Sequence, residues 1–343
     1  MPNILVLTQK VDINDDVLSF FHRWLVEFSK HADKITVICL YEGQHSLPSN
    51  VSVISLGKES GLSRGSYLIN FYRHIWQMRH SYSSVFVHMN QEYVILGSLI
   101  WKILGKKIMM WRNHYAGNFM TLLAVLLSDD VFCTSRYSFT ARFKKTSFMP
   151  VGIDTDFFSP RDVSLRKENS LLFLARISPS KRPDLLIEAL HILKESGAIF
   201  TTTFYGNPTP RYSSFFESIK EKALLYNLDV SFIPGIANDQ TLDIYRSNDV
   251  FINTSPSGMF DKTILEAMAS GCLTVVSSKD LLGKIDKRLF FKEGDASDLA
   301  RALREVTHAP SEEKEAMRSS LRRLVVSEHS LHKLGEMVAK HFV

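Results

Sequence analysis

Short apolar runs alternate with longer helical patterns along the first 149 residues. The runs have the length of buried strands, and the stretches between them repeat apolar side chains at the three- and four-residue spacing of a helix. This alternation predicts a parallel sheet with helices on its faces. We expect strands at residues 4–7, 35–40, 51–55, 85–88, 108–111, 131–134 and 146–149. We expect helices at residues 16–31, 68–79, 93–104 and 119–127.

The pattern restarts after residues 150–160, PVGIDTDFFSP, which carry proline at both ends, one glycine and two aspartates. This composition is typical of a linker. We therefore expect two doubly wound parallel-sheet domains, residues 1–155 and 156–328, with a last helix, 329–343, that packs back on the first domain. Strands are expected at residues 170–175, 200–205, 230–233, 250–252, 273–276 and 289–291. Helices are expected at residues 183–195, 212–226, 238–247, 295–306, 311–326 and 331–342.

The stretch 251–278, FINTSPSGMFDKTILEAMASGCLTVVSS, reads as a strand, a small polar loop, a helix and a second strand. A loop of Ser, Pro and Gly before a helix presents unpaired backbone N–H groups, and the helix dipole adds positive potential there. Such a place binds phosphate well, and Glu266 in the second turn could accept hydrogen bonds from a ribose diol. An ordinary strand–helix–strand unit with a solvated Glu266 explains the spacing equally well.

Polar residues follow other strands of both halves, and ligands of open α/β sheets bind at the carboxyl ends of the strands. Arg176 and Lys181 lie in a basic loop after the strand at 170–175 and could clamp a diphosphate, unless the loop is simply solvated. With two domains, we expect the site in the cleft between them. In the first half, the residues at strand ends that could meet substrate hydroxyls are Asp12, Asn14, Asp15, His88, Asn90 and His114, although Asp16 fits a helix cap and a lone His is more often a packed residue.

Several site classes are absent from the sequence. The segment after the first strand has no glycine, so the G-x-G-x-x-G fingerprint of nicotinamide and flavin proteins is missing. No G-x-S-x-G elbow and no H-E-x-x-H motif occur. The three cysteines, Cys39, Cys133 and Cys272, are too few and too scattered for a disulfide framework or a metal site, and they fit a reducing cytosol.

Charge and hydropathy refine this picture. The chain has 343 residues, 45% of them hydrophobic and 22% charged, which is typical of a globular protein with ample core. Its net charge of +5 comes from residues 1–155, which hold sixteen Lys or Arg and eleven Asp or Glu. The N-terminus reads as a buried strand rather than a signal peptide. Residues 67–82 interleave aromatic and basic side chains and could touch anionic lipid, although an ordinary surface helix is the favoured interpretation.

The C-terminal motifs resemble a known family. LARISPSKRPDLLIEAL, FYG, the loop before Pro234-Gly235 and SPSGMFDKTILEAMASG, together with PVGIDTDFFSP, are similar to the retaining glycosyltransferases of family 4. The resemblance covers most of the chain and is stronger in the C-terminal half. It implies the GT-B architecture, in which two Rossmann-like domains face a central cleft. The first domain would bind the acceptor, and the second would bind the nucleotide sugar.

The resemblance also implies roles for individual residues. Arg176 and Lys181 match the basic pair that holds the donor diphosphate, Glu266 matches the Glu that binds the ribose, and His114 matches a His that contacts the donor sugar near the reaction centre. The segment along the nucleobase corresponds to Pro234, Gly235 and Ile236. Backbone N–H groups that would face the donor sugar or its phosphates belong to Met259, Phe260, Asp261, Thr263 and Ile264.

Two positions depart from the family's pattern. Gly258 stands where the first Glu of the family's E-x7-E motif is usual, and the nearby Asp261 could substitute for that carboxylate. The family's glycine-rich loop after the first strand is replaced by VDINDD. These departures affect how the donor sugar and the acceptor are held.

The implied activity is transfer of a sugar from a UDP- or GDP-sugar to an acceptor hydroxyl with retention of configuration. The acceptor expected from the resemblance is a carbohydrate or glycolipid of polysaccharide biosynthesis. Fixed cations would stabilise the leaving diphosphate, so neither a metal nor another cofactor is expected. We expect a cytoplasmic protein, with possible peripheral contact to the inner face of an anionic membrane and no nucleic-acid partner. A sugar-nucleotide epimerase of the same architecture and a non-catalytic sugar-nucleotide binder are the alternatives.

Overall fold

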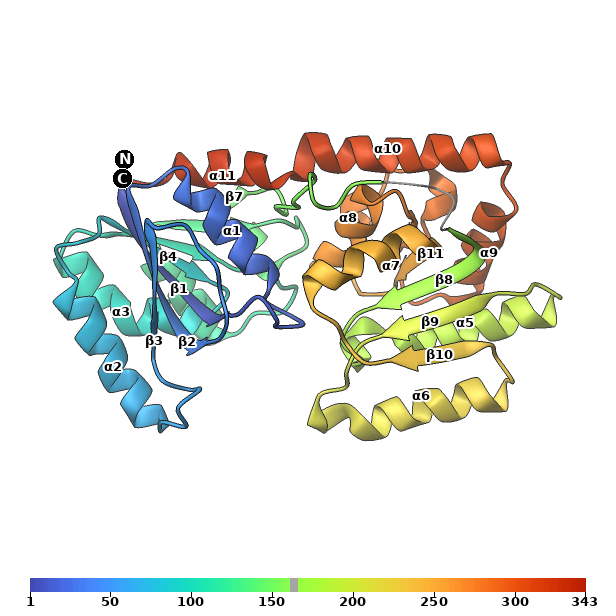
Figure 1. The fold of residues 1–343 in the computed structure, drawn as a ribbon, viewed down its shortest axis with the longest axis horizontal. Coiled ribbons are helices and arrows are strands. Elements are labelled where there is room, and N and C mark those ends of the chain that lie inside the picture. The colour runs from blue at the N-terminus through green and yellow to red at the C-terminus, as the bar shows by residue number, and fades with distance from the viewer. Residues whose placement is uncertain (161–165) are drawn as a thin grey trace. The chain divides into compact units, whose positions relative to one another are not determined.

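Two compact units make up the fold in the computed structural model, which describes residues 1–160 and 166–343 (Figure 1). The first unit comprises Met1–Gly152 and Leu331–Val343, and the second comprises Ile153–Ser330. Each unit is an α/β domain built on a parallel sheet. The segment expected to be an open linker begins inside the first unit, because residues 150–152 are buried and the Trp24 indole donates to the Gly152 carbonyl at 3.0 Å.

The sheet of the first unit has seven strands in the order β3-β2-β1-β4-β5-β6-β7, and all neighbours are parallel. Its central strands are apolar and buried on both faces, as a parallel sheet covered by helices requires. The strands are β1 (Asn3–Val11), β2 (Lys34–Glu42), β3 (Val51–Ser55), β4 (Ser84–His88), β5 (Lys107–Trp111), β6 (Asp130–Cys133) and β7 (Thr146–Phe148).

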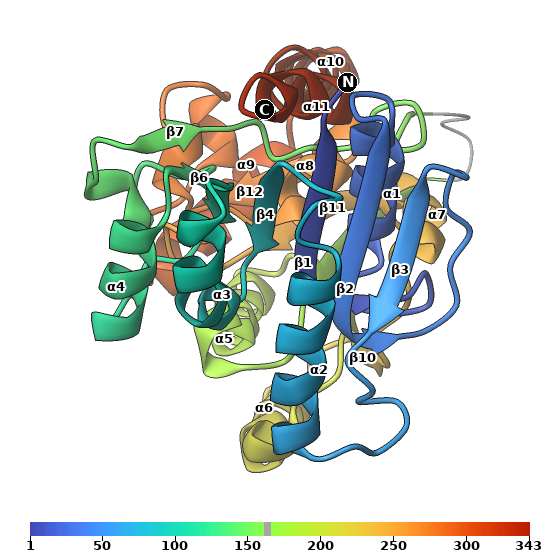
Figure 2. The same cartoon turned by 90° about the vertical axis from the view of Figure 1, so that its left-hand side faces the viewer.

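Helices cover both faces of this sheet. One face packs against α1 (Phe20–Ser29) and the C-terminal helix α11 (Leu331–Ala339) around Trp24, Phe28 and Leu334. The other face packs against α2 (Arg64–Gln77), α3 (Gln91–Ile103) and α4 (Phe119–Leu127), which Figure 2 shows in front of the sheet. The chain therefore returns to its first unit at the C-terminus.

The second unit has a five-stranded parallel sheet in the order β10-β9-β8-β11-β12. The strands are β8 (Lys167–Leu174), β9 (Thr201–Tyr205), β10 (Val230–Ile233), β11 (Asn248–Asn253) and β12 (Leu273–Val276). The helices are α5 (Pro183–Glu195), α6 (Ser213–Leu225), α7 (Thr241–Ser247), α8 (Lys262–Ala269), α9 (Ala296–Thr307) and α10 (Ser311–His329). No helix within the described ranges combines the length and apolar character needed to cross a membrane.

Some expected elements differ from the structure, and among them the helix expected from Leu68 begins four residues earlier, at Arg64. The strand expected at 289–291 is wrong, because this segment forms a single turn (η7, Lys287–Leu289) and one isolated bridge between Val276 and Phe290. The first helix was expected from Asp16 but begins at Phe20. The residues just before this helix form a separate turn, in which the Asp15 carboxylate accepts hydrogen bonds from the backbone N–H groups of Val17 and Leu18.

A buried ion pair fixes α10 to the second sheet. Asp249 at the start of β11 is 2% exposed, and its Oδ1 accepts a hydrogen bond from Arg318 Nη2 at 2.5 Å. Lys314 lies 3.9 Å from the other carboxylate oxygen. Removing one member of such a pair leaves the other charge buried with little compensation. The resulting loss of stability is therefore larger than the net contribution of the ion pair itself.

We expect Arg318→Ala to lower the free energy of unfolding of the second unit by about 3–5 kcal/mol, because Asp249 keeps a buried charge. Urea denaturation of the full chain, followed by circular dichroism, measures this loss. The matched control is Lys284→Ala, which removes an exposed pair with Glu328 and should cost less than about 1 kcal/mol. Equal losses for the two variants would contradict the proposed role of the buried pair.

Candidate functional site

The stretch 251–278 forms the expected unit: β11 leads through a polar loop into α8, and β12 follows in parallel. The loop backbone is unusual at two positions, since Gly258 has φ +95° and Phe260 has φ +39°. A glycine adopts such angles without strain, whereas other residues do so at a cost. The loop is thus held in a particular shape at the carboxyl end of β11, where ligands of open α/β sheets bind.

Glu266 is a buried residue of α8, which excludes the solvated interpretation. It is 3% exposed, and its carboxylate accepts hydrogen bonds from Asn238 Nδ2 at 2.9 Å and from the buried Tyr245 hydroxyl at 3.1 Å. Burial lowers the pKa of Lys262, one turn earlier, to about 7, while attraction to Glu266 opposes this shift. Two hydrogen-bond donors therefore orient the Glu266 carboxylate.

Lys181 and Asp261 form an ion pair that joins the basic loop to the start of α8. Lys181 Nζ lies 2.5 Å from Asp261 Oδ1. The other oxygen, Oδ2, accepts hydrogen bonds from Ser255 Oγ at 2.6 Å and Asn253 Nδ2 at 3.1 Å. Burial raises the pKa of Asp261, but these partners outweigh it and keep the pKa below its ordinary value. Asp261 is thus ionised, and its carboxylate is directed at Lys181 rather than at the first N–H groups of α8.

Sequence reasoning missed three polar residues that hold this arrangement. They are Asn253, Thr254 and Ser255. The buried Thr254 hydroxyl lies 2.6 Å from the Lys181 carbonyl oxygen and 2.9 Å from the Arg182 carbonyl oxygen, and it donates towards both. Their position directly after β11 was the available signal, since strand ends in this class of sheet collect functional groups. Together they fix both the backbone and the ammonium group of Lys181.

Arg176 is exposed on the same basic loop, and no salt bridge of its side chain is found in the parts of the chain that the structure describes. The loop is fastened to the end of β9, where Gly206 has φ +158° and a Cβ at that position would lie 1.9 Å from the Ala175 carbonyl oxygen. Only glycine allows this approach. The glycine of the FYG motif therefore allows the loop that carries Arg176 to pack closely against the end of β9.

The predicted nucleobase segment follows β10. Gly235 and Ile236 are half-buried there, and the Gly235 N–H donates to Asn207 Oδ1 at 3.2 Å. Asn207 itself follows Gly206 at the end of β9. Because β10 and β9 are parallel neighbours, the two loops emerge at the same edge of the sheet. The second unit therefore brings its predicted donor-binding segments to one edge.

In the first unit, the acidic segment after β1 is engaged within its own turn. Lys10 Nζ contacts Asp15 Oδ2 at 2.7 Å and Asp12 Oδ2 at 3.2 Å. Asn14 Nδ2 donates to Gln44 at 3.0 Å. Burial raises the pKa of Asp15, yet its hydrogen bonds from Lys10, Leu18 and Val17 hold the pKa below the ordinary value. The side chains of the three predicted acceptor-side residues of this turn thus already have partners, which are Lys10 and Gln44.

The predicted residues after β4 and β5 differ in their surroundings. His88 is 2% exposed, and its ring stacks on Phe21 with centroids 4.2 Å apart, which favours the packed-residue interpretation over an acceptor contact. Asn90 is half-buried at the start of α3. His114 is also half-buried, and its Nδ1 lies 2.9 Å from the Ala116 backbone nitrogen and 3.2 Å from the Ala116 carbonyl oxygen.

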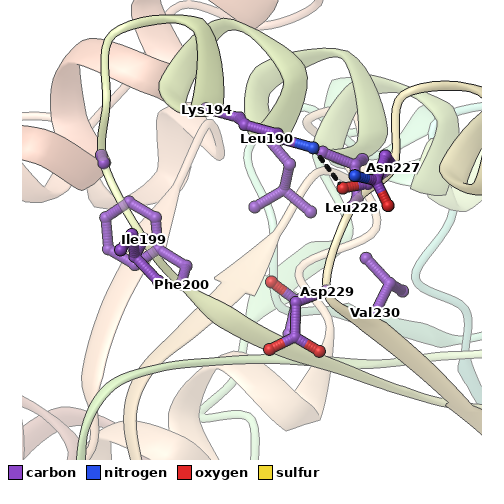
Figure 3. A pocket seen from close by; sticks show the side chains of 10 residues that line it. Leu190, Lys194, Ile199, Phe200, Asn227, Leu228, Asp229 and Val230 are labelled. Atoms are coloured by element: carbon purple, nitrogen blue, oxygen red, sulfur yellow. Dashed lines mark hydrogen bonds between the residues drawn. The ribbon is translucent and has the colours of Figure 1, made fainter.

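One cavity of about 140 Å³ lies elsewhere in the second unit, at the starts of β9 and β10 and the end of α5 (Figure 3). Leu190, Phe200 and Val230 line it, and Lys194 reaches across it to donate to the Asn227 carbonyl. None of the predicted site residues borders this cavity. Within the described ranges, no group of three or more His, Cys, Asp or Glu side chains is arranged to hold a metal ion.

We expect Gly206→Ala to destabilise the second unit by about 1–3 kcal/mol or more, because the new methyl group forces the Ala175–Arg176 backbone away. Thermal unfolding measures the loss. Gly197→Ala is the matched control: it has φ +80° but open space around its Cβ position, so it reports the backbone strain without the collision. The assignment fails if both variants lose the same stability.

Comparisons with known proteins show which proteins this chain is similar to. Residues 155–323 match the family model described as Glycosyl transferases group 1. The mannosylfructose-phosphate synthase of Agrobacterium fabrum is 28% identical over 148 residues, which are 39% of this chain and 33% of that protein. The D-inositol 3-phosphate glycosyltransferase of Geodermatophilus obscurus is 27% identical over 149 residues, again 39% of this chain and 33% of that protein. The matches thus span about a third of the length of these relatives.

Solved structures resemble the chain over its whole length. HepE of Anabaena, in complex with UDP and glucose, has a TM-score of 0.78 at 17% identity and covers 99% of both chains. The sucrose-phosphate synthase of Thermosynechococcus elongatus has a TM-score of 0.77 at 14% identity, covering 99% of this chain and 98% of its own. At such identities the likeness shows the fold alone. Residues 155–323 therefore match the group 1 glycosyl transferases, and the chain has the GT-B fold.

Proposed function

We propose that this protein is a glycosyltransferase that moves a sugar from a nucleoside-diphosphate sugar to an acceptor hydroxyl, with retention of configuration. The observation that carries the proposal is the positioned Lys181 ammonium beside the start of α8, within the region that matches the group 1 family. Arg176 supplies a second, exposed cation on the same loop. Cations and helix N–H groups in one place suit a diphosphate.

Catalysis by such a site is chiefly electrostatic. The diphosphate gains negative charge as its bond to the sugar breaks, and donors already fixed in place stabilise that charge without reorganising. Lys181, Arg176 and the N–H groups of Thr263 and Ile264 are the proposed donors to the leaving group. The Ile264 N–H already donates to the Asp261 carbonyl oxygen at 3.3 Å, so this N–H group would be shared between that carbonyl and the diphosphate. His114 of the first unit is proposed to contact the donor sugar.

The rest of the donor has proposed partners as well. Glu266, oriented by Asn238 and Tyr245, would accept hydrogen bonds from the ribose hydroxyls, and Gly235 and Ile236 would lie along the base. A UDP-sugar donor is supported by HepE, whose structures contain UDP and UDP-glucose; a GDP-sugar fits the same residues. We propose that no metal takes part, that the acceptor is a carbohydrate or glycolipid, and that the protein acts in the cytoplasm.

One observation favours a second candidate, a non-catalytic sugar-nucleotide binder. Gly258 occupies the place of the family's usual first Glu, and the Asp261 carboxylate that could replace it is engaged by Lys181, Ser255 and Asn253. Incubation with UDP- and GDP-sugars and candidate acceptors separates the two functions. Acceptor-dependent release of nucleoside diphosphate supports transfer, whereas binding without turnover supports the binder; epimerised donor would instead support an isomerase.

We expect Lys181→Ala to weaken binding of UDP or GDP by about 10- to 100-fold, since a hydrogen bond to a charged group contributes about 1.5–3 kcal/mol. Isothermal titration calorimetry measures the dissociation constant. Lys292→Ala, which removes a side chain that is 80% exposed, should leave the affinity unchanged. Unaltered affinity of Lys181→Ala for both nucleotides would rule out the phosphate clamp.

A further inference from the structure

Helix α4 combines an apolar sequence with an exposed position. Its nine residues, FMTLLAVLL, include no charged side chain. Ala124 and Val125 face the core of the first unit, yet on the outer side Phe119 is 74% and Leu126 is 60% exposed. Helices that are apolar on all sides are normally buried. The outer side of α4 therefore has the character of a surface that contacts something apolar.

Helix α3 continues this surface. It packs against α4, and its Leu99 and Ile103, one turn apart, are 71% and 75% exposed. Figure 2 shows α3 and α4 on the same side of the sheet. We call Leu99, Ile103, Phe119, Leu122 and Leu126 the α3–α4 face. Single exposed apolar residues are ordinary, but five on two adjoining helices form a patch of the kind that marks an interaction site.

The stretch of the chain that carries this face is strongly positive. Residues 64–148, which form α2 to β7, hold eleven Lys or Arg and three Asp or Glu, a net charge of +8, so the remainder of the chain is at −3. Lys102 is exposed between Leu99 and Ile103, and Arg142 and Lys144 are exposed in the segment before β7. Lys145 Nζ donates to the carbonyls of Leu126 and Ser128 at the end of α4, which places a cation beside the apolar patch.

We propose that the α3–α4 face docks on an anionic lipid bilayer. Apolar side chains flanked by Lys and Arg suit the boundary between lipid head groups and acyl chains, where burial and attraction to anionic lipids act together. A second copy of this chain is a poorer occupant, because an isologous contact would bring two segments of net charge +8 together. The face extends the lipid contact expected for residues 67–82 to a different pair of helices and does not depend on sugar transfer.

The test is co-flotation of the full-length protein with vesicles. We expect binding to phosphatidylcholine vesicles that contain about 30% phosphatidylglycerol, and binding at least about tenfold weaker to phosphatidylcholine alone or at high salt. The double variant Leu99→Ser/Leu126→Ser should lose at least about tenfold in affinity for the anionic vesicles, because it removes apolar contact while both sites are exposed in the fold.

Two controls keep the test decisive. Leu224→Ser/Leu225→Ser changes side chains on α6 that are 82% and 78% exposed, and it should bind like the parent protein. Lys102→Glu/Lys144→Glu should weaken binding to anionic vesicles while circular dichroism shows an unchanged fold. Absence of parent binding to anionic vesicles overturns the proposal. So does a dimer in light scattering that the Leu99/Leu126 variant dissociates, since the face would then be a contact between copies.

Discussion

The Asp261 carboxylate is the interaction on which the arrangement of the loops after β8 and β11 depends. It binds Lys181 from the loop after β8 and Ser255 and Asn253 from the loop after β11, and it stands at the first turn of α8. A charge this enclosed is tolerated only when its partners are in place. The three segments are consequently fixed together, and the position of the Lys181 ammonium is a property of the whole network rather than of its own loop.

This dependence changes how the basic loop is understood. An isolated lysine on a loop contributes a mobile charge, whereas Lys181 has its backbone carbonyl bonded by Thr254 and its ammonium bonded by Asp261. A cation that is already oriented is the condition under which electrostatic stabilisation of a phosphate is effective. The same principle applies to Glu266, whose two donors, Asn238 and Tyr245, come from other segments of the unit.

Much of the fold could be predicted from the sequence, because buried parallel strands and amphipathic helices leave strong local patterns. The exceptions have local causes. Residues 289–291 are apolar because they contribute to the core, and they do not pair as a strand. The turn around Asp15 occupies residues that were expected to be helical, so α1 begins only at Phe20. The segments of the candidate site were proposed from the sequence, but the contacts between their side chains could not be predicted. Lys181 and Asp261 are 80 residues apart, and no spacing rule indicates that they pair. The core position of His88 likewise depends on packing against α1.

The left-handed backbone at Gly258 limits which residues can stand at this position. The residue that the family usually places there is a glutamate, but φ +95° is an angle that a glutamate adopts only with strain. Reinstating the acid by one substitution would strain the loop, while Asp261 already occupies the polar network beside it. A carboxylate at position 258 would therefore require a change in the backbone of the loop, so the loop conformation and the residue at this position depend on each other.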